Sequence, residues 1–169
     1  WLATINLGYT PQMRTLIALM LFATTPVAAG DYEDGAAAYK ARDYQKALRL
    51  WKSLAEQGNV QLQLLLGLKY KEGIGVPKDD AKAAYWLTKA AEQGGEDAQT
   101  KLGVMYRYGH GVPEDYVLAY AWLSITAARG GTYANLNKEL IAKLMTLAQI
   151  AEGQKLPHVV PEIDNQAMW

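Results

Sequence analysis

The sequence predicts an all-α protein, an α-solenoid of stacked helix–turn–helix repeats with a capping helix at its C-terminal end. The first reason is an internal repeat: residues 66–95 and 102–131 are identical at 14 of 30 positions when aligned by a shift of 36 residues. Unrelated segments of that length would share about two residues, so the identity reflects a repeated structural unit. The second reason is that apolar residues recur at helical spacing within each copy, and glycines and a proline interrupt them at the same place.

The pattern of residues 13–29 indicates a secretory signal peptide. Met13 and a basic residue precede eight contiguous apolar residues, and a small-residue Val-Ala-Ala sequence ends at Ala29. Cleavage is expected after Ala29, and residues 1–12 are then an extension upstream of the natural start. The alternative is a buried helix or a membrane anchor, but eight apolar residues are too few for a span of about 20. We therefore expect an exported chain, periplasmic or secreted, with no membrane span after signal removal.

The solenoid is expected over residues 31–156, followed by a flexible tail over 157–169. Its units are a short first hairpin, two full repeats and a pair of capping helices, at 31–58, 61–95, 97–131 and 132–156. In a full repeat the first helix contains a tyrosine near its end, a Gly-x-Gly-Val-Pro loop follows, and Asp79 or Asp115 caps the second helix. After residue 131 the match to the repeat fades, which predicts that the last helices close the stack.

Two glycines inside the first helices, Gly67 and Gly103, indicate close helix packing. A glycine within a helix costs about 1 kcal/mol relative to alanine. Its recurrence at the repeat spacing therefore predicts that a second helix passes close to each one. Trp51, Trp86 and Trp122 lie on the apolar stripes of the second helices, which predicts core positions in preference to sugar-stacking surfaces.

The repeated motif resembles that of a known family. The string Leu-Gly-x-x-Tyr-x-x-Gly-x-Gly-Val-Pro-x-Asp, followed by Ala-x-x-Trp and Ala-Ala-Glu-Gln-Gly, is similar to the Sel-one-like repeat, a longer-looped relative of the tetratricopeptide repeat. The first hairpin has lost the long glycine loop, because Tyr39 lies only four residues before Asp43, and it resembles a plain tetratricopeptide unit. The resemblance implies stacked helical hairpins and a role as an adaptor that binds other proteins.

Composition and motifs give little support to catalysis or cofactor binding. The chain has no cysteine, which excludes disulfides and thiolate chemistry. It has 17 basic and 17 acidic residues, which argues against a general nucleic-acid binder. Gly73-Ile74-Gly75 lacks the Gly-Lys-Ser/Thr element of a phosphate loop. The two histidines, His110 and His158, have no further ligands at metal-binding spacing. We expect no catalytic residue, cofactor or metal site.

A basic residue directly follows the tyrosine of each first helix, at Lys40, Lys71 and Arg107. In the tetratricopeptide relatives this position faces a concave groove, where cations can clamp a peptide carboxylate. By the same analogy, neutral side chains line the groove, namely Leu64, Leu68, Thr100, Val104 and Tyr108. The alternative interpretation is a solvated row of charges with no partner.

Two classes of function remain open. The first is a non-enzymatic interaction scaffold of the cell envelope that holds a protein or peptide, acidic or carboxylate-ended, in the concave groove. The second is an enzyme or accessory subunit of cell-wall metabolism, since some cysteine-containing members of the resembled family have been linked to such chemistry. The absence of cysteines and of an acid–base pair favours the scaffold.

Overall fold

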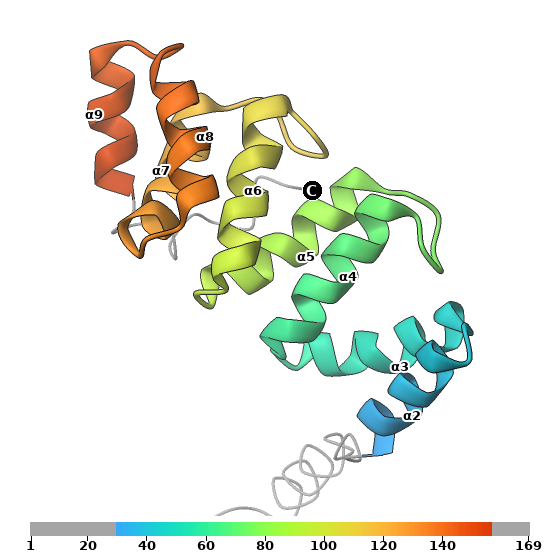
Figure 1. Ribbon diagram of the computed structural model, residues 1–169. Helices are drawn as coiled ribbons and strands as arrows, with labels where there is room; N and C mark the ends of the chain where they lie inside the picture. The colour runs from blue at the N-terminus through green and yellow to red at the C-terminus, as the bar shows by residue number, and fades with distance from the viewer. Residues whose placement is uncertain (1–29, 157–169) are drawn as a thin grey trace, which may run out of the picture.

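The computed structural model describes residues 30–156, and these form eight helices and no strand. In chain order the helices are α2 (Gly30–Lys40), α3 (Tyr44–Glu56), α4 (Val60–Glu72), α5 (Asp80–Glu92), α6 (Glu96–Tyr108), α7 (Tyr116–Ala128), α8 (Thr132–Ala142) and α9 (Leu147–Lys155). Helices α2 and α3, α4 and α5, and α6 and α7 pack as hairpins, and the hairpins are stacked from α2 at one end to α8 and α9 at the other (Figure 1). The predicted all-α solenoid is confirmed. The expected signal peptide and tail lie outside the described residues.

Side-chain caps set where the second helix of each hairpin begins. Asp43, Asp79 and Asp115 accept hydrogen bonds from the backbone N–H three residues later, at 3.1, 2.9 and 2.9 Å. Such a cap satisfies a backbone donor that has no partner within the helix. The first helices of the two full repeats end at Gly73 and Gly109, whose φ angles of 72° and 65° are left-handed. The predicted helix boundaries follow from these residues.

The helices within a full repeat meet at the two glycines that the sequence singles out. A Cβ atom built on Gly67 would lie 2.7 Å from Leu87 Cγ, and one built on Gly103 would lie 2.7 Å from Leu123 Cγ. Leu87 and Leu123 are completely buried. Glycine therefore allows each leucine to pack directly against the backbone of the opposite helix. Trp51, Trp86 and Trp122 are also buried, as predicted.

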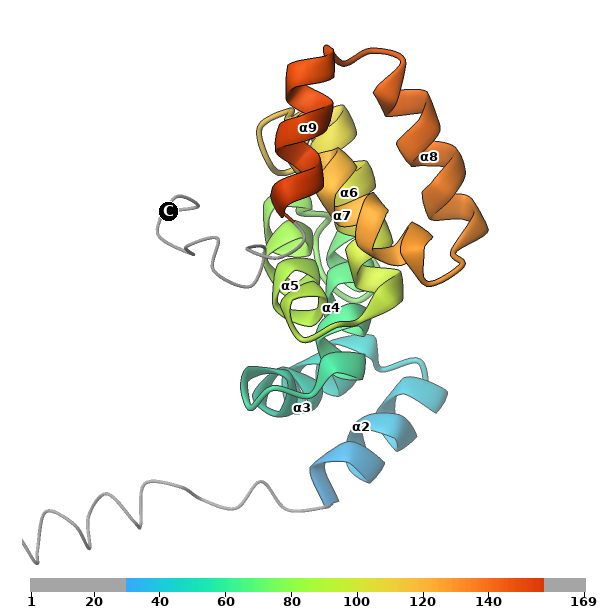
Figure 2. The same cartoon turned by 90° about the vertical axis from the view of Figure 1, so that its left-hand side faces the viewer.

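The stack ends differently from the way it begins. Helices α8 and α9 both pack on α7, on either side of it, and make little contact with each other (Figure 2). Thr146 caps α9 in a reciprocal capping box with Gln149, as the sequence suggests for Thr146. Gly153 lets α9 approach α7, since a Cβ there would lie 3.0 Å from Tyr120 Cδ1. The last two helices thus cover α7 separately and do not form a fourth hairpin.

Candidate functional site

The residues that the sequence predicts for partner binding lie on α2, α4 and α6, the first helices of the three hairpins. Helices α4, α6 and α8 begin at Val60, Glu96 and Thr132, which are 36 residues apart, so residues 36 apart occupy equivalent positions on them. Lys71 lies near the end of α4 and is half-buried. Arg107 lies at the equivalent position of α6. The structure therefore places these two cations in one column.

Arg107 already has partners within the chain. Its Nη1 donates a hydrogen bond of 3.0 Å to Asn137 Oδ1 on α8, and its guanidinium lies 4.8 Å from the centre of the Tyr108 ring. The side chain at this position therefore crosses from one first helix to the next. It fixes α8 against α6 and holds a positive charge beside the exposed ring of Tyr108.

Lys40 does not share the position of Lys71, contrary to the sequence-based alignment. In α2 the glycine packed against the opposite helix is Gly35, whose Cβ would overlap the Trp51 indole, as a Cβ at Gly67 would meet Leu87. Counting from these glycines places Tyr39, not Lys40, at the Lys71 position. One residue turns a helix by about 100°. Lys40 instead matches Glu72 and Tyr108, and it is exposed.

The structure identifies a third member of the column that the sequence analysis missed. Lys143, at the end of α8, follows Arg107 by 36 residues and is exposed. The spacing alone could have revealed it. The fading of the repeat after residue 131, for example Glu139 in place of Gly103, concealed it. Glu139 is tolerated because this position is exposed on α8, whereas Gly103 is buried on α6.

The apolar residues nominated for the groove lie on one side of their helices. Leu64, Leu68, Thr100 and Val104 are half-buried, and Tyr108 is 51% exposed. Their equivalents on α8 are Leu136, Leu140 and Leu144, which the sequence analysis also missed, and on α2 the equivalents are Tyr32 and Ala36. We call the eight positions that follow one another across the four helices the A-helix face: Tyr32, Ala36, Leu64, Leu68, Thr100, Val104, Leu136 and Leu140.

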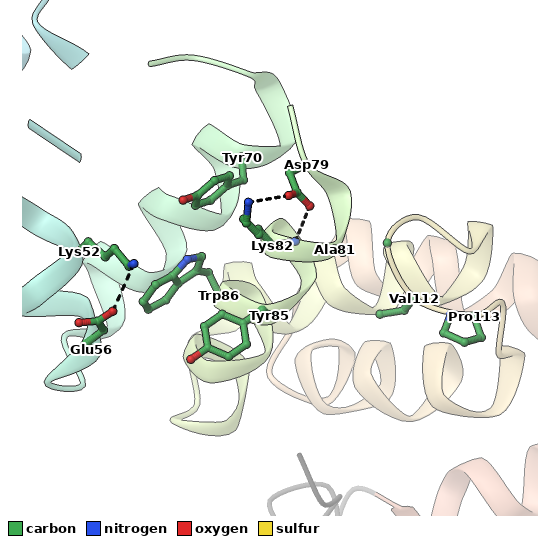
Figure 3. A pocket seen from close by; sticks show the side chains of 11 residues that line it. Lys52, Glu56, Tyr70, Asp79, Ala81, Lys82, Tyr85, Trp86, Val112 and Pro113 are labelled. Carbon is green, nitrogen blue, oxygen red and sulfur yellow. Dashed lines mark hydrogen bonds and ion pairs between the residues drawn. The ribbon is translucent and has the colours of Figure 1, made fainter. Parts of the chain in front are cut away.

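A separate cavity of about 710 Å³ lies where α3, α4 and α5 meet the loop before α7. Tyr70, Tyr85 and Trp86 line it, and Val112 and Pro113 lie at its far side (Figure 3). No local pattern in the sequence indicates this cavity, because it depends on side chains from four segments. Trp86 is only 3% exposed, so its ring is a wall of the cavity and offers no face for stacking.

The charged groups of the cavity neutralise one another. Lys52 pairs with Glu56 at 3.7 Å and Lys82 pairs with Asp79 at 3.0 Å. Hydrogen bonds from the Lys82 backbone N–H and from its ammonium group lower the pKa of Asp79, and the same pair raises the pKa of Lys82. Two cations and two carboxylates leave the lining without net charge, so it carries no electrostatic preference for a ligand.

The described residues offer no metal centre. Residues 30–156 contain no group of three or more His, Cys, Asp or Glu side chains able to hold an ion. The His110 ring stacks on Tyr108 with 5.7 Å between ring centres, in the loop where the sequence places it. His158 lies outside the described residues. Within residues 30–156, no helix has the length and apolar character required to cross a membrane.

Comparison with known proteins identifies the repeat. Residues 28–59, 60–95 and 96–131 each match the Sel1 repeat. The first match is shorter than the other two, in agreement with the short α2–α3 connection and with Gly35 as the equivalent of Gly67. None of the curated proteins matches the chain.

Two solved structures are similar to the chain. One is a protective antigen present in uropathogenic Escherichia coli strains that displays an SLR fold, with 30% identity and a TM-score of 0.70 over 87% of this chain and 32% of the antigen. The other is a Sel1 repeat protein from Oxalobacter formigenes, with 34% identity and a TM-score of 0.56 over 63% of this chain and 44% of that protein. The chain thus spans less than half the length of either structure. Sel1 repeat proteins are generally protein-interaction scaffolds. The three repeat matches cover more than half of the sequence, and the chain belongs to the Sel1 repeat family.

Proposed function

We propose that the chain is a non-enzymatic adaptor of the cell envelope that holds a protein or peptide partner against its A-helix face. The observation that carries the proposal is that all eight positions of this face, on α2, α4, α6 and α8, are uncharged. Many other water-accessible positions of the same helices carry lysine, arginine, aspartate or glutamate. An extended uncharged surface bordered by charge is typical of a protein-binding site.

The charges beside the face favour a partner of opposite charge. Lys71, Arg107 and Lys143 form one column along it, so an acidic or carboxylate-ended partner is favoured. Each exposed ion pair contributes only about 0.2–1 kcal/mol, so the apolar contacts must supply most of the affinity. Binding is expected to weaken as the salt concentration rises, because exposed charges are screened beyond about 8–10 Å.

The test is affinity purification of the tagged full chain from the envelope fraction of its source cell. Leu68→Asp places a charge on the A-helix face and should abolish recovery of the partner. Leu147→Asp is the matched control, because Leu147 is 86% exposed and lies on α9, which contributes no residue to the face. Lys71→Glu combined with Arg107→Glu should weaken binding and reduce its salt dependence. Equal recovery of the partner with Leu68→Asp and with the wild type, both shown to be folded by circular dichroism, would refute the proposal.

Export is the second part of the proposal, and it rests on the sequence of residues 13–29. The mature protein recovered from the envelope fraction should begin at Gly30, as read by N-terminal sequencing or intact mass. A chain recovered from the cytoplasm with Arg14 still present would contradict it.

A further inference from the structure

Helix α8 carries an exposed apolar surface that no other helix of residues 30–156 covers. Leu136, Leu140 and Leu144 are 54%, 47% and 60% exposed, and we call them the leucine ridge. They are spaced by four residues and therefore lie along one side of the helix. A single exposed leucine is ordinary in a soluble protein, whereas three on successive turns form a contiguous apolar patch.

The ridge continues the A-helix face to its C-terminal end. Its leucines occupy the positions of Thr100, Val104 and Tyr108 on α6. The side of α8 where a paired second helix would pack is polar instead, and Asn135 Nδ2 donates a hydrogen bond of 2.7 Å to Glu139 Oε1 there. Helix α8 is therefore adapted to water on one side and keeps its leucines on the side shared with the A-helix face.

Positive charge borders this ridge, and the hydrogen bond of Arg107 shows what kind of group a cation at this position binds. Arg107 reaches from α6 to an oxygen acceptor on the next first helix, Asn137 of α8. Lys143 stands at the same position of α8, after which no further first helix follows within residues 30–156. The acidic residue Glu139 lies one turn before Lys143, and Asn135 Nδ2 donates a hydrogen bond to its carboxylate. A partner that covers the ridge therefore meets a cation and gains from supplying an oxygen acceptor.

We propose that the leucine ridge is the principal anchor of the A-helix face and binds an acidic amphipathic segment of a partner protein. Large apolar side chains of the segment cover Leu136, Leu140 and Leu144, and an Asp, a Glu or a C-terminal carboxylate accepts a hydrogen bond from Lys143. This inference rests on the proposed function and assigns its dominant contact and its ligand chemistry.

The experiment is selection of random dodecapeptides displayed on phage against the immobilised full chain. Enriched peptides should contain at least two large apolar residues and an acidic one. The synthetic consensus peptide should lose about tenfold or more in affinity on Leu140→Asp, because the contact of one fully buried leucine is worth at least that factor. Lys143→Glu should remove the preference for acidic residues in a repeated selection. Lys155→Glu on α9 makes the same change of charge away from the ridge and should leave the selection unchanged.

Several results would overturn the inference. They are an absence of enriched peptides, enrichment of basic peptides, and affinity that is insensitive to Leu140→Asp. A dimer in light scattering that dissociates on Leu140→Asp would show that a second copy covers the ridge. Co-sedimentation with anionic phospholipid vesicles that is lost on the same substitution would show that the ridge binds membrane. If the partner captured from the cell is lost on Leu68→Asp but retained on Leu140→Asp, the proposed function stands and the ridge is not its anchor.

Discussion

Replacing Gly103 by alanine adds one methyl group at the closest contact between α6 and α7. The new Cβ would lie 2.7 Å from Leu123 Cγ and 3.2 Å from the Ala119 carbonyl oxygen. A normal carbon–carbon contact is about 3.5–4.0 Å, so Leu123 or the helix must move by roughly 1 Å. Leu123 is completely buried, and the surrounding core leaves it little room.

Two effects of opposite sign decide the result. Alanine is favoured over glycine in a helix by about 1 kcal/mol, whereas overpacking costs typically about 1–3 kcal/mol. We expect Gly103→Ala to destabilise the protein by up to about 2 kcal/mol, and Gly103→Val by more. Leu123→Ala alone should cost about 2–5 kcal/mol because it leaves a cavity. In that background the added methyl meets no leucine, so Gly103→Ala should become neutral or stabilising.

The assay is urea unfolding followed by circular dichroism, applied to the wild type, the two single variants and the double variant. The predicted coupling energy is about 1–3 kcal/mol in favour of the double variant. Val104→Ala is the control, because it truncates the neighbouring half-buried residue on the A-helix face and should cost much less than Gly103→Val. A stabilising Gly103→Ala in the wild type, or an equal loss with and without Leu123, would refute the packing argument.

Two further predictions concern stability. Gln99 Oε1 is buried without a hydrogen bond among the described residues. In the preceding repeat, Gln93 donates a hydrogen bond to the equivalent oxygen, that of Gln63. Arg129→Gln should supply the same donor to Gln99 and raise the free energy of unfolding by about 1 kcal/mol in a urea titration. Because hydrogen bonds to Lys82 lower the pKa of Asp79 from 3.8, its carboxylate stabilises the fold above that pH and ceases to do so as pH falls through the lowered value. Asp79→Asn should therefore be less stable than the wild type at pH 7, and the difference measured by thermal unfolding should close below about pH 4.

The repeat made most of the fold predictable, because its residues have local physical roles. Asp79 caps a helix and Gly73 ends one, whatever the rest of the chain does. For Gly67 one further inference was needed: a glycine that destabilises its helix indicates a side chain packed close to it, and that side chain is Leu87. These inferences held because each residue type tolerates few other environments.

The register of the first hairpin was misjudged for an equally physical reason. The sequence comparison aligned tyrosines, whereas the fold aligns the glycines that contact the opposite helix. In α2 a tryptophan, Trp51, fills the place of Leu87, and the residue at the repeat-tyrosine position is Ala38. Tyr39 therefore stands one position later than Tyr70 does, and Lys40 was placed in the wrong column.

The features at the end of the stack depend on tertiary packing that no local pattern specifies. Helix α9 covers α7 through Gly153, and α8 is left without a paired helix. This arrangement exposes the leucine ridge. From the sequence, Leu136 and Leu140 are indistinguishable from core residues of an ordinary amphipathic helix. The cavity beside Trp86 was equally unpredictable, because it arises between segments distant in the chain.

Binding of partners to the A-helix face can be mapped by photocross-linking in the source cell. A photoreactive benzoylphenylalanine is placed in turn at Leu68, Val104 and Leu140 on the face, and at Lys52 and Leu147 away from it. We expect cross-links to one common protein from the three positions on the face and none from the two controls. Cross-links from Lys52 or Leu147, and none from the three positions on the face, would contradict binding at the A-helix face.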